Sequence, residues 1–204
     1  MNFASKTLLT SLLAAALAFA CTHTVNVYRY QYDSTLDEVY FKEGVDFSKY
    51  HQIMIDDISV WRPSAHVLSK EDAVIARANL AKAQDLFRKT VSDAVADRYP
   101  ITTRAGADVL RVQVEFIDLR ALAPGEELPT DLNRLRFRTQ PGHITMIARL
   151  LDSRSGEQLA RAADLGKQES RGSYTLVDWE AIASDFDYWA RVFRSWLDRM
   201  QAQG

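Results

Sequence analysis

Apolar and polar residues alternate with period two in several stretches of the chain, which is the pattern of β-strands with one buried face. In the clearest stretch, 107–119, the apolar positions are Leu110, Val112, Val114 and Phe116. A second alternating stretch covers 144–150, and a third covers 159–165. Residues 152–157 (DSRSGE), which separate these two, contain the Asp, Ser and Gly typical of tight turns. We therefore predict that the last two strands form a β-hairpin.

A run rich in β-branched residues, 51–61 (HQIMIDDISVW), predicts the first core strand. The apolar positions in its middle are Ile53, Ile55, Ile58 and Val60. They change from odd to even numbers halfway along the run, although the side chains of a regular strand alternate strictly between two faces. One residue must therefore be extra, and we place a β-bulge at Asp56-Asp57.

Two further stretches repeat apolar residues every three or four positions, as amphipathic helices do. The first begins at a capping box, 69–72 (SKED), and ends before Pro100. Its apolar stripe consists of Leu80, Ala83, Phe87, Val91 and Ala94. The second follows a potential N-cap, Asp178, and its stripe consists of Ile182, Phe186, Trp189, Phe193, Trp196 and Met200. This aromatic stripe suits either a partner's groove or a core, and we interpret it as core because a helix lying on a sheet requires such a face.

The order strand, helix, strand, loop, hairpin and helix predicts an α+β domain with a four- or five-stranded, mostly antiparallel sheet and two long helices packed on one face. We assign this single domain to residues 40–204. Residues 22–34, within the preceding segment 21–39, alternate polar and aromatic side chains and form either an edge strand or a tether. Segment 123–142 contains three prolines and two glycines and is predicted to be a long loop or a ragged hairpin.

The first 20 residues have the pattern of a signal peptide. Lys6 precedes an apolar run, 8–20, that is shorter than the ~20 residues of a membrane-spanning helix. Small residues at Ala18 and Ala20 suit a signal peptidase, and the chain's one cysteine, Cys21, follows directly. This arrangement resembles the lipobox of bacterial lipoproteins, in which the cysteine after the cut becomes the acylated first residue. The alternative is ordinary secretion with an unmodified thiol.

Composition sets outer limits on the function. Lys and Arg number 25 against 27 Asp and Glu, so the net charge of −2 gives no reason to expect binding to nucleic acid. Hydrophobic residues make up 47% of the chain and charged residues 25%, which is typical of a globular domain. A single cysteine excludes a disulfide within the chain, and stability must therefore come from packing.

The sequence contains little that predicts catalysis. The four histidines lack the spacing of metal ligands, and no nucleophile, phosphate-binding or dinucleotide motif is present. We therefore assign no catalytic residue, no metal and no cofactor. Asp56 and Asp57 could act as paired carboxylates, but adjacent strand residues point to opposite faces, and a bulge accounts for both.

Three arginines in segment 123–142 fall on one face of an extended chain: Arg134, Arg136 and Arg138. Guanidinium groups bind phosphate and carboxylate through a fork of hydrogen bonds, so these residues are candidate contacts for an anionic lipid or an acidic partner. The alternative is a solvated face on which they pair with Glu126, Glu127 and Asp131.

Several of these features occur together in one known family. They are Cys21, the segments 45–50 (VDFSKY), 108–112 (DVLRV) and 152–157, and the aromatic last helix. The combination resembles domain-of-unknown-function family 3313 of bacterial lipoproteins, over about Tyr40 to Met200. The resemblance implies a lipid-anchored periplasmic domain and provides no catalytic residues to transfer to this chain.

Together these observations indicate an envelope lipoprotein that acts as a non-enzymatic binding or accessory module. Its partners would be the membrane, through the lipid on Cys21, and an envelope protein or anionic lipid. Thr22 follows the cysteine, whereas lipoproteins retained in the inner membrane usually have Asp there, so we expect the periplasmic face of the outer membrane. The alternative is an envelope-acting hydrolase without a recognisable catalytic motif.

Overall fold

The computed structural model describes residues 27–31, 34–61, 70–118, 143–169 and 179–202. The predicted signal peptide, Cys21 and segment 123–142 lie outside the described residues, as do the two helix-cap candidates Ser69 and Asp178.

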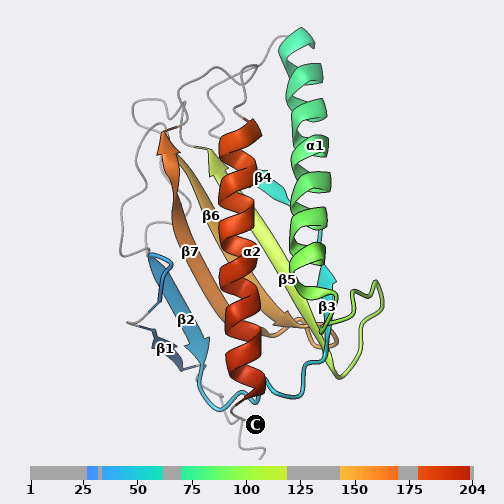
Figure 1. Ribbon diagram of the computed structural model, residues 1–204, viewed down its shortest axis with the longest axis vertical. Helices are drawn as coiled ribbons and strands as arrows, with labels where there is room; N and C mark the ends of the chain where they lie inside the picture. The colour runs from blue at the N-terminus through green and yellow to red at the C-terminus, as the bar shows by residue number, and fades with distance from the viewer. Residues whose placement is uncertain (1–26, 32–33, 62–69, 119–142, 170–178, 203–204) are drawn as a thin grey trace, which may run out of the picture.

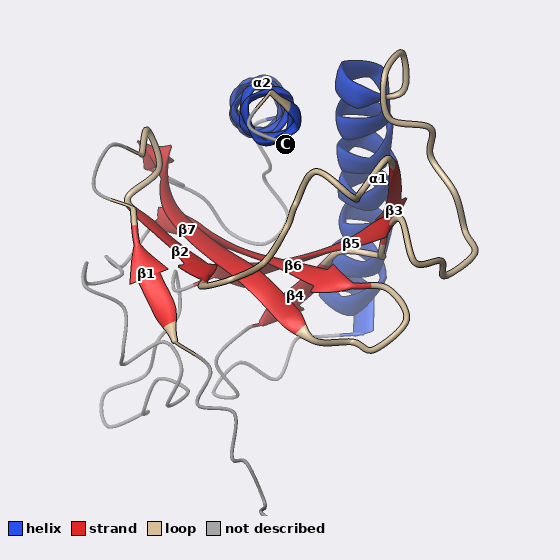
Figure 2. Cartoon of the chain, turned by 90° about the horizontal axis from the view of Figure 1, so that it is seen from below, coloured by secondary structure: helices blue, strands red, loops and turns tan. Residues whose placement is uncertain are grey.

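One mixed sheet and two long helices make up the fold (Figure 1). The strands are β1 (Tyr28–Tyr30), β2 (Glu38–Lys42), β3 (Gln52–Ile55), β4 (Ser59–Trp61), β5 (Val109–Asp118), β6 (His143–Asp152) and β7 (Gln158–Glu169). The helices are α1 (Lys70–Val95) and α2 (Trp179–Gln201). Figure 2 shows both helices on the same side of the sheet. The predicted α+β class is confirmed.

The sheet is larger than predicted. It has seven strands in the order β1-β2-β7-β6-β5-β3, with β4 also paired to β5, instead of four or five. Two of the additional strands, β1 and β2, begin before residue 40. Strand β1 forms one edge of the sheet and lies within 22–34, where the sequence left an edge strand and a tether as alternatives. The third arises because the predicted first core strand is divided into β3 and β4.

The sheet is also antiparallel only in part. Strands β3 and β4 run parallel to β5, whereas the pairs along β1-β2-β7-β6-β5 are antiparallel. Parallel neighbours need a long crossover connection, and α1 provides it between β4 and β5. The alternating pattern of β5 favoured antiparallel pairing in the sequence and did not reveal this β-α-β unit.

The predicted change of register at Asp56-Asp57 is confirmed, as a break between two strands. Ile55 pairs with Val112 and Ser59 pairs with Glu115, so four steps along β3-β4 match three along β5. The extra residue lets Ile58, like Ile53 and Ile55, enter the core.

The predicted hairpin of β6 and β7 is confirmed as well. Asp152 Oδ1 accepts hydrogen bonds from the backbone N–H groups of Arg154 (3.0 Å) and Ser155 (2.9 Å). Gly156 has a φ of 72°, a left-handed conformation that glycine adopts without steric cost. The turn therefore fixes the register in which the two strands pair.

The core lies between the helices and the sheet, and its aromatic residues form two groups. In the first, Phe116 of β5 stacks on Phe186 and Trp189 of α2, and Phe87 of α1 packs edge-on against it. The second joins α2 to β2 and the following loop and consists of Trp196, Phe193, Phe41 and Phe47. The structure thus places the aromatic stripe of α2 in the core.

One carboxylate is buried beside the first aromatic group. Asp164 of β7 is only 6% exposed, and its Oδ2 accepts a hydrogen bond of 2.7 Å from Trp189 Nε1. Burial raises the pKa of Asp164 to about 6, and the charge of Asp37 acts in the same direction, whereas the Trp189 hydrogen bond opposes the shift.

Asp164→Asn is expected to change the pH dependence of stability. An acid whose pKa is raised on folding stabilises the fold fully below its unfolded pKa, and that contribution is lost as the pH rises through about 6. The variant should therefore be roughly 1 to 2 kcal/mol more stable at pH 8, after discounting for solvent screening, and no more stable than the parent near pH 4. Urea unfolding at several pH values, with exposed Asp187→Asn as control, measures this difference. A difference that stays constant with pH would contradict the assignment.

Candidate functional site

A cavity of about 810 Å³ lies between α2 and the helix-facing side of the sheet. The described side chains around it are mainly apolar and include Val39, Phe41, Met146, Trp189, Phe193 and Trp196. Small-molecule sites are typically of this size and character, an apolar concavity with a few polar groups.

Three alanines explain why the space is open. Ala148 of β6 is paired with Ala162 of β7, and Ala160 lies two residues earlier on the same face of β7. All three line the cavity. Their small methyl groups leave room beneath α2.

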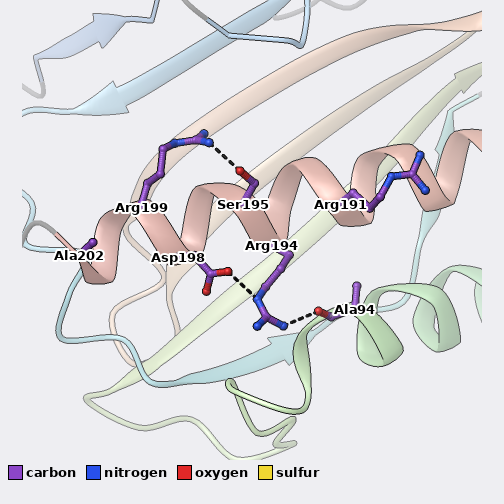
Figure 3. A pocket seen from close by; sticks show the side chains of 7 residues that line it. All are labelled: Ala94, Arg191, Arg194, Ser195, Asp198, Arg199 and Ala202. Carbon is purple, nitrogen blue, oxygen red and sulfur yellow. Dashed lines mark hydrogen bonds and ion pairs between the residues drawn. The ribbon is translucent and has the colours of Figure 1, made fainter.

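A row of polar residues on α2 borders the cavity. Arg191, Ser195 and Arg199 are spaced four residues apart, all three are exposed, and all three line the cavity. Arg199 Nη1 donates a hydrogen bond of 2.7 Å to Ser195 Oγ (Figure 3). Within the described part of the chain, neither Arg191 nor Arg199 forms an ion pair. We call these three residues the α2 arginine row.

The same row lines an outer recess of about 560 Å³ between α2 and the end of α1. There Arg194 and Asp198 point toward α1 (Figure 3). Arg194 Nη1 donates to the carbonyl oxygen of Ala94 (2.8 Å), and its Nε donates to Asp198 Oδ2 (2.9 Å). Hydrogen bonds to Asp97 and Asp198 raise the pKa of the Arg194 guanidinium. Because its donors are engaged, Arg194 fastens α2 to the C-terminal end of α1, and we interpret the recess as structural.

One buried donor beside the cavity lacks an acceptor. Trp196 is 8% exposed, and its Nε1 makes no hydrogen bond within the residues that the structure describes. Buried polar atoms are paired in the great majority of cases. Trp196 lines the cavity, so a ligand held there is one source of the missing acceptor.

The two carboxylates considered for acid/base chemistry do not share a site. Asp56 Oδ2 lies 2.8 Å from Arg111 Nη2 and accepts a hydrogen bond of 2.8 Å from Gln113 Nε2. Asp57 pairs instead with Arg88 of α1. Their engagement with separate partners agrees with the prediction that the pair is structural.

The other predicted site residues, Cys21, Arg134, Arg136 and Arg138, lie outside the described residues. In the described ranges, no cluster of three or more His, Cys, Asp or Glu side chains is arranged to hold a metal ion. None of the helices in those ranges has the length and hydrophobicity needed to span a bilayer.

Comparison with known families supplies the classification. The family model described as "Protein of unknown function (DUF3313)" matches residues 31–193. The chain belongs to this family. The match includes β2 to β7 and most of α2, and the resemblance seen in the sequence is thereby confirmed.

Several solved structures are similar to this DUF3313 chain at low identity. A PelC dodecamer from Paraburkholderia phytofirmans has 9% identity and a TM-score of 0.39, over 76% of this chain and 96% of that one. A DUF4136 protein from Bacteroides thetaiotaomicron has 11% identity and a TM-score of 0.41, over 85% and 97%. A DUF330 protein from Xanthomonas campestris has 14% identity and a TM-score of 0.33, over 76% and 89%. No curated protein matches the chain.

Sequence reasoning did not single out the cavity or the α2 arginine row. The sequence did contain an indication of the cavity. Pairing across the 152–157 turn places Ala148 opposite Ala162, and two small side chains facing each other leave space on the sheet. A second indication was the position of Arg199 in the last turns of α2, three residues after Trp196, next to the aromatic stripe.

Proposed function

We propose that this DUF3313 protein is a lipid-anchored lipoprotein of the periplasmic face of the outer membrane and works as a non-enzymatic binding module. The observation that supports binding most directly is the cavity of about 810 Å³ bordered by the α2 arginine row. An apolar space with a few polar groups at its border suits a ligand, whereas acid/base chemistry needs carboxylates that converge on one point. Asp56 and Asp57 are instead held by Arg111 and Arg88.

The anchor rests on the sequence of the N-terminus. Seven residue steps separate Cys21 from the start of β1 at Tyr28. Even a fully extended chain of that length spans no more than about 25 Å. A lipid on Cys21 would therefore hold the sheet close to the membrane, within reach of amphiphilic molecules. Arg134, Arg136 and Arg138 remain candidate contacts for an anionic headgroup or an envelope protein partner.

Cys21→Ser tests the anchor. Acyl chains contribute about 0.8 kcal/mol per buried CH₂, so a lipidated parent should fractionate with membranes and the variant with the soluble periplasmic proteins. The intact mass of the purified parent should exceed that of its mature chain by the mass of the attached lipid. Sucrose-gradient separation of the two membranes then tests the outer-membrane assignment.

The melting temperature of the variant is the control. The released variant should melt at the temperature of the parent, because residue 21 precedes the first strand. Equal partition of parent and variant, with an unmodified mass for the parent, would rule out the anchor and favour plain secretion.

A further inference from the structure

We infer that the cavity beneath α2 binds a single-chain anionic amphiphile, a fatty-acid-like molecule whose acyl chain fills the cavity and whose acid group lies against the α2 arginine row. The inference rests on the proposed binding function and names its ligand class. It is independent of the lipid anchor on Cys21.

The apolar lining selects a hydrocarbon chain. Aromatic and aliphatic side chains from β2, β6 and α2 surround the space, and Ala148, Ala160 and Ala162 form its floor on the sheet. Burying a hydrocarbon chain against such surfaces contributes about 25 cal/mol per Å² of apolar area removed from water. A polar ligand would lose its hydration there without gaining hydrogen bonds.

The volume of the cavity suits a ligand with one acyl chain. A methylene group takes up roughly the volume of a water molecule, about 30 Å³, so a chain of about 16 carbons needs on the order of 500 Å³. That chain fits the cavity of about 810 Å³. Two such chains would need on the order of 1,000 Å³ and exceed it. A two-chain phospholipid therefore suits the cavity less well than a fatty acid.

The charge at the border selects an anion. Arg191 and Arg199 line the cavity, are exposed, and have no carboxylate partner within the described ranges. Arg194, which lies between them on the helix, is held by Asp97 and Asp198. The guanidinium groups of the α2 arginine row thus keep donors for an incoming acid group. The buried Nε1 of Trp196 offers a further donor beside the cavity.

Binding of palmitate to the full mature chain tests this assignment. Every arm carries Cys21→Ser, so that no detergent is needed, and 1-hexadecanol serves as the neutral ligand of equal chain length. Calorimetric titration should detect one palmitate per chain. The variant Arg191→Gln/Arg199→Gln should weaken palmitate binding about tenfold, as expected for two exposed charge pairs, and leave binding of 1-hexadecanol unchanged. The control Arg104→Gln/Arg154→Gln removes the same charge at two exposed positions that do not line the cavity, and it should match the parent.

A second variant tests whether the acyl chain of the ligand lies in the cavity. Ala148→Leu/Ala162→Leu fills the floor of the cavity and should weaken both ligands at least tenfold, while leaving the melting temperature equal or higher. If this variant does not fold, the arginine variants alone still decide the headgroup contact through the difference between the two ligands.

Three outcomes would overturn the inference. Absence of palmitate binding to the parent would exclude the ligand class. Equal weakening of palmitate and 1-hexadecanol by the arginine variant would exclude the headgroup contact. Association with vesicles of anionic phospholipid in the absence of palmitate binding would favour a membrane surface instead. None of these results depends on the fractionation of Cys21→Ser, so the ligand and the anchor can fail separately.

Discussion

Replacing Trp196 with alanine is expected to lower the free energy of unfolding by roughly 3 to 5 kcal/mol, the usual cost of truncating a buried aromatic side chain. The indole stacks on Phe41 of β2 at 5.4 Å between ring centroids and meets Phe47 edge-on at 5.1 Å. Its removal enlarges an existing cavity, so the neighbouring side chains have little opportunity to close the gap. Urea unfolding followed by circular dichroism measures the loss.

Trp196→Phe is the matched control. It keeps an aromatic ring beside Phe41 and removes the Nε1–H, which has no acceptor within the described residues. We therefore expect this variant to lose much less stability than Trp196→Ala. If the alanine variant unfolds at the same urea concentration as the parent, the stripe of α2 faces solvent or a partner and is not part of the core.

Phe116→Ala is expected to cost a similar amount, roughly 3 to 5 kcal/mol. Phe116 lies where the sheet meets both helices, with ring centroids 5.5 Å from Phe186, 5.6 Å from Trp189 and 6.4 Å from Phe87. Aromatic pairs add about 0.5 to 1.5 kcal/mol beyond the area that they bury, and alanine removes three of them at once.

Phe116→Leu distinguishes lost aromatic contacts from lost volume. Leucine retains most of the buried apolar surface, so its cost should be clearly smaller than that of alanine, and the m-value of unfolding should stay unchanged. Equal costs for leucine and alanine would show that ring geometry, and not buried area, determines the stability at this position.

The sequence predicted the elements that are determined by residues close to one another along the chain. The β6-β7 hairpin follows from one turn, and the stripes of α1 and α2 follow from the 3.6-residue period. Parallel pairing of β3 and β4 with β5 depends on the path of the chain through α1. The residue pattern of a single short segment does not predict that path. Strand β2 was missed because its pairing partner, β7, lies far along the chain, and its own five residues show no clean alternation.

The candidate site was harder to predict for a related reason. Ala148 and Ala162 look like ordinary core positions in a strand, and a cavity results only because both lie opposite one helix. Arg191 and Arg199 look like the solvated face of α2 until the carboxylates near them are located. Asp97 and Asp198 both form ion pairs with Arg194. These ion pairs could not be predicted without knowing that the C-terminal ends of α1 and α2 lie side by side.

The pairing of β2 with β7 also bears on how the chain folds. Glu38 pairs with Ala163 and Phe41 with Ala160, while the Tyr188 hydroxyl donates to the carbonyl oxygen of Thr35 across 153 residues. Contacts between such distant segments form slowly, because a long loop must close before they contribute any stability. Strand β2 and Thr35 therefore depend on β7 and α2, which follow much later in the chain. Docking of β2 on β7 is consequently expected to be one of the slow steps of folding.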